Sequence, residues 1–154
     1  MTSDRLFLRH AVATLAYRAG KAVRGAPATF ADFTVADGSR TPVRIVAHMG
    51  DLLDWALYLA RGEQSWHDSM PLPWDLEVAR LFAALAAFDA YLASEESLGW
   101  SAERLFQGPI ADALTHTGQL TMLPPRWRTG SRRKLREGNH YRRDGWHLAG
   151  GPRL

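Results

Sequence analysis

Four stretches of this chain repeat apolar residues at intervals of three and four, the spacing that lines one face of an α-helix. They cover residues 3–23, 41–62, 75–94 and 109–123. No stretch shows the strict alternation of apolar and polar residues that is typical of a half-buried β-strand. Helices with narrow apolar seams bury these seams against one another. The pattern therefore predicts an all-α protein, a four-helix bundle.

Local signals mark where these helices begin and end. Thr41 suits the N-cap of the second helix, and Pro42 suits its first position, where an N–H would be unpaired anyway. A helical turn is expected near residues 102–106, before the fourth helix. Pro124 and Pro125 end that helix, because a proline has no N–H to donate and clashes with the preceding turn.

Charge divides the chain into two parts. Residues 1–123 carry 10 Lys and Arg against 14 Asp and Glu, a formal charge of −4. Residues 124–154 carry 9 against 2, a formal charge of +7, and have no apolar periodicity. We therefore expect one bundle domain over residues 1–123, followed by a basic C-terminal tail over 124–154 that is irregular or partly disordered.

Composition excludes several classes of protein. The chain has no cysteine, which excludes disulfides, thiolate metal sites and a cysteine nucleophile. A metal would therefore need His, Asp, Glu or water as ligands. No apolar run approaches the roughly 18 residues of a membrane-spanning helix, and the first twenty residues lack the pattern of a secretory signal. We expect a cytoplasmic protein that does not bind membranes.

Three polar residues interrupt the apolar seams. His48 occupies a seam position of the second helix, and Asp112 and His116 occupy successive seam positions of the fourth. Residues four apart stack on one helix face, so Asp112 and His116 point the same way. A buried carboxylate needs a partner. Two imidazole nitrogens and one carboxylate oxygen could meet at one divalent ion and leave a coordination position open, as in catalytic metal sites.

Each of these residues also has an ordinary structural interpretation. His48 alone could be a core histidine with satisfied hydrogen bonds. Asp112 could fix the tautomer of His116 through a hydrogen bond within the helix, or favour the helix dipole from the first turn. A metal-free bundle in which these polar residues only set the helix register is a further alternative.

Two segments resemble a known family. The segment "IVAHMGDLLDWALYLARG" resembles the second-helix signature of the DinB-like (YfiT-like) metalloprotein superfamily, and "IADALTHTGQLTML" is similar to its fourth-helix signature. The resemblance covers about residues 4–123. It implies an up-down-down-up bundle, often dimeric, with a divalent ion held by three histidines at one end. By position, His48 matches the first ligand and His116 the last, whereas Asp112 stands where the family has its middle histidine.

The resemblance also implies a chemistry. Members of the family include thiol transferases that use bacillithiol or mycothiol, and mycothiol-dependent maleylpyruvate isomerases. It therefore implies a divalent ion (Zn, Ni, Mn or Fe), a low-molecular-weight thiol cosubstrate and a homodimer. The alternative is a non-catalytic protein whose tail, with Trp127, Tyr141 and Trp146 between basic residues, binds nucleic acid or another acidic partner. A solvated tail is the simpler interpretation of that composition, so nucleic acid is not favoured.

Overall fold

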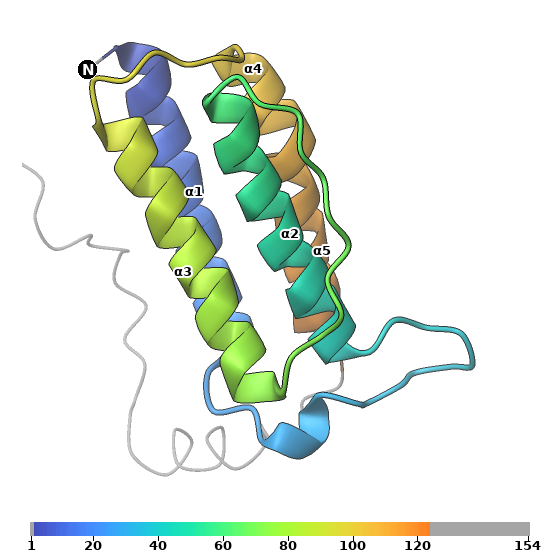
Figure 1. The fold of residues 1–154 in the computed structure, drawn as a ribbon. Helices are drawn as coiled ribbons and strands as arrows, with labels where there is room; N and C mark the ends of the chain where they lie inside the picture. The colour runs from blue at the N-terminus through green and yellow to red at the C-terminus, as the bar shows by residue number, and fades with distance from the viewer. Residues whose placement is uncertain (1, 124–154) are drawn as a thin grey trace, which may run out of the picture. The chain divides into compact units, whose positions relative to one another are not determined.

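A computed structural model describes residues 2–123 of the protein, and this part of the chain is helical without any β-strand (Figure 1). The elements are α1 (Ser3–Val23), the short 3₁₀-helix η1 (Ala28–Phe30), α2 (Pro42–Ala60), α3 (Trp74–Ala93), α4 (Ala102–Leu105), the π-helical turn η2 (Phe106–Ile110) and α5 (Ala111–Met122). The predicted all-α class is therefore confirmed for the described residues. The predicted basic tail, residues 124–154, lies outside them.

The last three elements form one continuous helix. The backbone stays in the right-handed helical region through Leu105, Phe106, Ile110 and Ala111. Pro109 lies inside this helix and has no N–H to donate, which is consistent with the widened π-helical turn around it. The expected helical turn near residues 102–106 is therefore present as α4, but it continues without a break into the helix expected over residues 109–123. Asp112 is not in the first turn of a helix with a free N-terminus, so a favourable interaction with the helix dipole does not explain its position.

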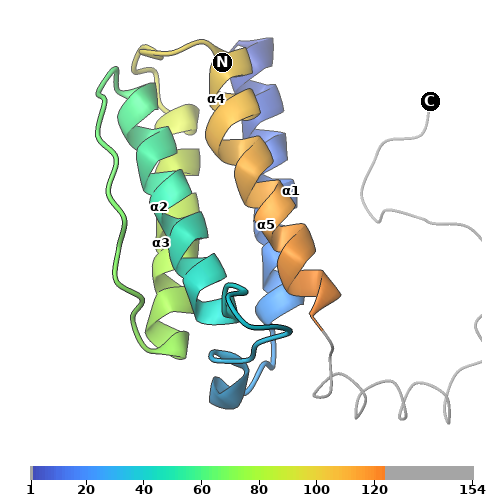
Figure 2. The same ribbon diagram turned by 90° about the vertical axis from the view of Figure 1, so that its right-hand side faces the viewer.

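The long helices lie side by side and run in two directions. In Figures 1 and 2, α1 and the α4–α5 helix run one way, and α2 and α3 run the other way. Each of α1 and α2 contacts both α3 and α5. The connection between α2 and α3, residues 61–73, returns along the whole length of the bundle beside α2 (Figure 1). This return lets two consecutive helices run in parallel.

The predicted apolar seams form the core. Leucine and phenylalanine side chains on all four long helices are fully or almost fully buried, and each contributes about 1.5–3 kcal/mol relative to an exposed position. They include Leu8, Leu15, Leu52, Leu59, Leu81, Leu85, Phe88, Leu92, Leu105 and Leu120. On α3 a charged residue also lies in the core, because Glu77 is buried while the neighbouring Val78 is only half-buried.

Within residues 2–123, no helix is both long enough and apolar enough to cross a bilayer. The cytoplasmic location stays a prediction.

Candidate metal centre

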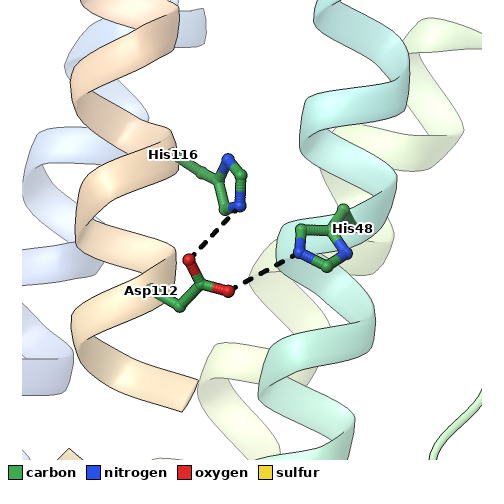
Figure 3. A group of neighbouring side chains, drawn as sticks. All are labelled: His48, Asp112 and His116. Carbon is green, nitrogen blue, oxygen red and sulfur yellow. Dashed lines mark ion pairs between the residues drawn. The ribbon is translucent and has the colours of Figure 1, made fainter. Parts of the chain in front are cut away.

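The three predicted site residues lie together where α2 and α5 face each other (Figure 3). His48 comes from α2, and Asp112 and His116 come from α5. One carboxylate oxygen of Asp112 lies 3.4 Å from Nε2 of His116, and the other lies 3.7 Å from Nε2 of His48. The imidazole centroids are 4.7 Å apart, with the ring planes at 89°. One atom from each residue therefore faces the same small volume.

These distances suit a shared cation better than hydrogen bonds. Hydrogen bonds from a ring N–H to oxygen are typically about 2.7–3.2 Å long, shorter than either contact of Asp112. Tetrahedral ligands about 2.0–2.2 Å from one ion lie roughly 3.3–3.6 Å from each other. The contacts at 3.4 and 3.7 Å, which join the two histidines to different oxygens of Asp112, lie close to that range. One ligand atom from each of the three residues lies within 4.8 Å of the others.

The site is open on one side. The side chain of His116 is 10% exposed and that of His48 is 19% exposed, but that of Asp112 is 48% exposed. The expectation of a carboxylate buried in the seam was therefore wrong. The neighbouring Ala113 takes the buried position at this level of α5, which leaves Asp112 at the rim. A ligand could therefore reach the site from solvent past the carboxylate.

Gln119 fixes the orientation of His116. Nδ1 of His116 lies 2.9 Å from Oε1 of Gln119, one turn further along α5. An amide oxygen only accepts hydrogen bonds, so Nδ1 donates; in the neutral ring, the lone pair is then on Nε2, the atom nearest Asp112. Partners of this kind hold metal-binding histidines in the required tautomer. This role of Gln119 was not predicted, although the three-residue spacing in "HTGQ" was the available signal.

His48 is held among aromatic side chains. The ring of Trp66 lies edge-on to the imidazole of His48, with 5.8 Å between the centroids. Trp66 in turn packs against Trp55, with 5.7 Å between the two ring centroids. Burial lowers the pKa of His48 below its ordinary value, the charges of His116 and Arg40 lower it further, and the Asp112 carboxylate opposes them. Burial therefore favours the neutral form of His48, which has a lone pair available. The contact between Trp66 and His48 was not predicted, because it depends on the path of the connection between α2 and α3.

A second group of residues has the composition of a metal site but is held by an arginine. Nε2 of His67 lies 3.3 Å from Asp51 and 3.4 Å from Asp54. The guanidinium of Arg80 contacts the same two oxygens, at 3.0 and 3.3 Å. Burial raises the pKa of Asp54, while Arg80 and His67 oppose this shift. A cation is thus already present among these carboxylates, and we interpret the group as an ion-pair network.

This network fastens the connection between α2 and α3. Arg80 also donates to Oε1 of Glu77 at 2.6 Å, and the second carboxylate oxygen of Glu77 accepts from the backbone N–H of Leu72 at 2.7 Å. The backbone N–H of Ser69 donates to Asp51 at 2.9 Å. Glu77 and Asp51 are almost fully buried. The loop that carries Trp66 is therefore anchored to α2 and α3 by buried charged groups.

Comparison of the chain with protein-family models, with curated proteins and with solved structures finds no match in any of the three. The resemblance to the DinB-like superfamily therefore stays a prediction.

Proposed function

We propose that the protein binds a divalent metal ion through His48, Asp112 and His116. The observation that carries this proposal is that one ligand atom from each of the three residues lies within 4.8 Å of the others, with the Nε2 atoms of the two histidines 3.4 and 3.7 Å from the two oxygens of Asp112. The hydrogen bond of Gln119 supports it, because it turns the lone pair of His116 toward the same point.

The charge around Asp112 also supports a cation. Among residues 2–123, the carboxylate of Asp112 has only the two histidines as ion-pair partners, whereas Asp51 has Arg80. The negative charge of Asp112 is thus not neutralised by an arginine or lysine of the described chain. Two imidazoles and one carboxylate are a donor set that Zn, Ni, Mn and Fe accept.

We further propose that the chain is a DinB-like protein with the up-down-down-up bundle of that superfamily, and that it forms a homodimer. The helix directions in Figure 1 and the long return between α2 and α3 support the bundle type. The large apolar side chains of Leu6 and Phe7, which are 49% and 53% exposed, support a further protein interface.

The activity that fits this site best is transfer of a low-molecular-weight thiol of the bacillithiol or mycothiol class. A divalent ion with an open position supplies a thiolate at neutral pH, because it lowers the pKa of a bound thiol. The chain's own residues shape access to that position. Trp66 covers one side of His48, and the exposed rim at Asp112 leaves an approach for the thiol and its electrophile.

Two measurements test the two parts of this proposal separately. Isothermal titration of zinc into metal-free protein should give one site per chain, and Asp112→Asn should weaken it about tenfold or more while Asp54→Asn leaves it unchanged. A model electrophile should then be conjugated to a low-molecular-weight thiol only when the protein carries bound zinc. Zinc binding without any thiol conjugation would reject the transferase and retain the metal site. Equal zinc binding by both variants would reject the metal site.

A further inference from the structure

A second binding feature adjoins the candidate metal centre. A pocket of about 250 Å³ is lined by Arg40, just before α2, by Arg44 and His48 of α2, and by Asp68 and Met70 of the connection to α3. Arg44 and His48 are four residues apart on α2 and therefore lie on the same face of that helix. The imidazole that would hold the ion thus also forms part of the wall of an arginine-lined pocket.

The charges of this pocket are unbalanced. Neither Arg40 nor Arg44 forms an ion pair with a carboxylate in the described part of the chain. Asp68 is the one carboxylate among the lining residues, so two guanidinium groups face one negative charge. The pocket carries a formal charge of +1, which a single additional negative charge would neutralise.

The loop that contributes Asp68, Ser69, Met70 and Pro71 to the pocket is held in place by buried groups. The N–H of Ser69, which also lines the pocket, donates to Asp51, whose side chain is only 1% exposed. The N–H of Leu72 donates to Glu77, which is fully buried. Buried carboxylates with these partners fix the loop on both sides of Met70 and Pro71. The pocket is therefore defined by the fold on two sides, by α2 and by an anchored loop.

We propose that this pocket binds the carboxylate of a small monoanionic organic ligand through Arg40 and Arg44. Guanidinium groups bind carboxylates with paired hydrogen bonds, and the net charge of the pocket is matched by the single negative charge of a carboxylate rather than by the larger mean charge of phosphate at pH 7. The volume is below the roughly 300–1,000 Å³ of sites for drug-sized molecules, so the pocket fits a small acid or the acidic end of a longer molecule.

This assignment deepens the proposed function and in that respect rests on it. It places the acidic end of the ligand at Arg40 and Arg44 and leaves the other end free to reach the metal position beyond His48. The test needs no metal, so its failure is distinguishable from failure of the metal site.

The test is an NMR titration of metal-free, full-length protein with propionate at pH 7, followed through the imidazole signals of His48. We expect a saturable shift, with binding weakened about tenfold in Arg40→Gln and in Arg44→Gln. Arg18→Gln is the matched control, because Arg18 is also exposed but lies on α1 away from this pocket. Unchanged backbone spectra would show that the variants fold.

The opposite results are equally clear. A shift that does not saturate, or that is the same in all three variants, would overturn the proposal. Inorganic phosphate serves as the competing probe. Tighter binding of phosphate than of propionate would overturn the assignment to a monocarboxylate.

Discussion

Replacing Arg80 by methionine should destabilise the protein strongly, because it removes the positive charge that faces three carboxylates. The guanidinium donates to Glu77 at 2.6 Å, to Asp51 at 3.0 Å and to Asp54 at 3.3 Å. The side chains of Glu77 and Asp51 are 0% and 1% exposed, so water cannot replace the lost partner. Methionine keeps most of the buried stem of arginine, which isolates the effect of the charge.

The magnitude follows from this burial. Removing one partner of a buried ion pair typically costs about 3–5 kcal/mol, because the remaining charge is left buried. Glu77 and Asp51 keep their backbone donors, Leu72 and Ser69, so we expect about 3 kcal/mol rather than the upper limit. A domain of this size is typically stable by about 5–15 kcal/mol, so the variant should still fold. Urea unfolding followed by circular dichroism measures the difference.

A second variant identifies the cause. If the stranded charge is responsible, adding Glu77→Gln to Arg80→Met should recover part of the lost stability, although Glu77→Gln alone destabilises the protein. Arg18→Met, at an exposed position of α1, should change the free energy of unfolding by less than about 0.5 kcal/mol. A loss below about 1 kcal/mol for Arg80→Met, or no recovery in the double variant, would refute the reasoning.

Three further predictions follow from other contacts. Gln119→Leu should weaken zinc binding about 10–100-fold in a chelator competition, and unchanged affinity would contradict the orienting hydrogen bond. Burial lowers the pKa of His48 in the folded protein below the ordinary value of 6.5, so the free energy of unfolding should decrease as the pH drops below that value. In His48→Asn, urea unfolding should show a smaller decrease over the same pH range. In Gly99→Ala the added methyl group would overlap the backbone of Gly62, so this variant should be destabilised by about 1–3 kcal/mol. Gly118 on α5 faces open space, so Gly118→Ala should be stabilised by about 0.5–1 kcal/mol. Thermal unfolding that finds Gly99→Ala more stable than Gly118→Ala would contradict the structure.

The sequence predicts the helices well where their signals are local. The helix expected over residues 3–23 is α1, Ser3–Val23, and α3 differs from its predicted range by one residue at each end. Caps, glycines and the apolar spacing act within a few residues, so they can be read directly. Pro109 misled the prediction because a proline resembles a helix start, whereas here a π-helical turn accommodates it.

The candidate site is only partly predictable, because local sequence signals do not show how distant segments pack together. The structure brings His48, Asp112 and His116 together, with Asp112 at the exposed rim rather than in the seam, and their role as metal ligands stays a prediction. The exposure of Asp112 depends on the rotation of α5 after its π-helical turn. Trp66 is near His48 only because of the long-range path of its loop. No periodic pattern carries that information.

The buried network around Arg80 illustrates the limit most clearly. Glu77 and Arg80 are charged residues on a helix, where spacing alone favours a solvated pair at i and i+3. Their burial follows from Asp51 on α2 and from the backbone of the returning loop, which are distant in sequence. Tertiary contacts therefore override the local pattern at this position.

The most direct test of the metal centre is the metal content of untagged protein, measured by mass spectrometry after zinc loading and dialysis. We predict close to one ion per chain, lost in His48→Ala and in His116→Ala, but retained in His67→Ala, which alters only the second histidine–aspartate group. Protein without bound metal, or metal lost in His67→Ala and retained in the other two variants, would contradict the assignment.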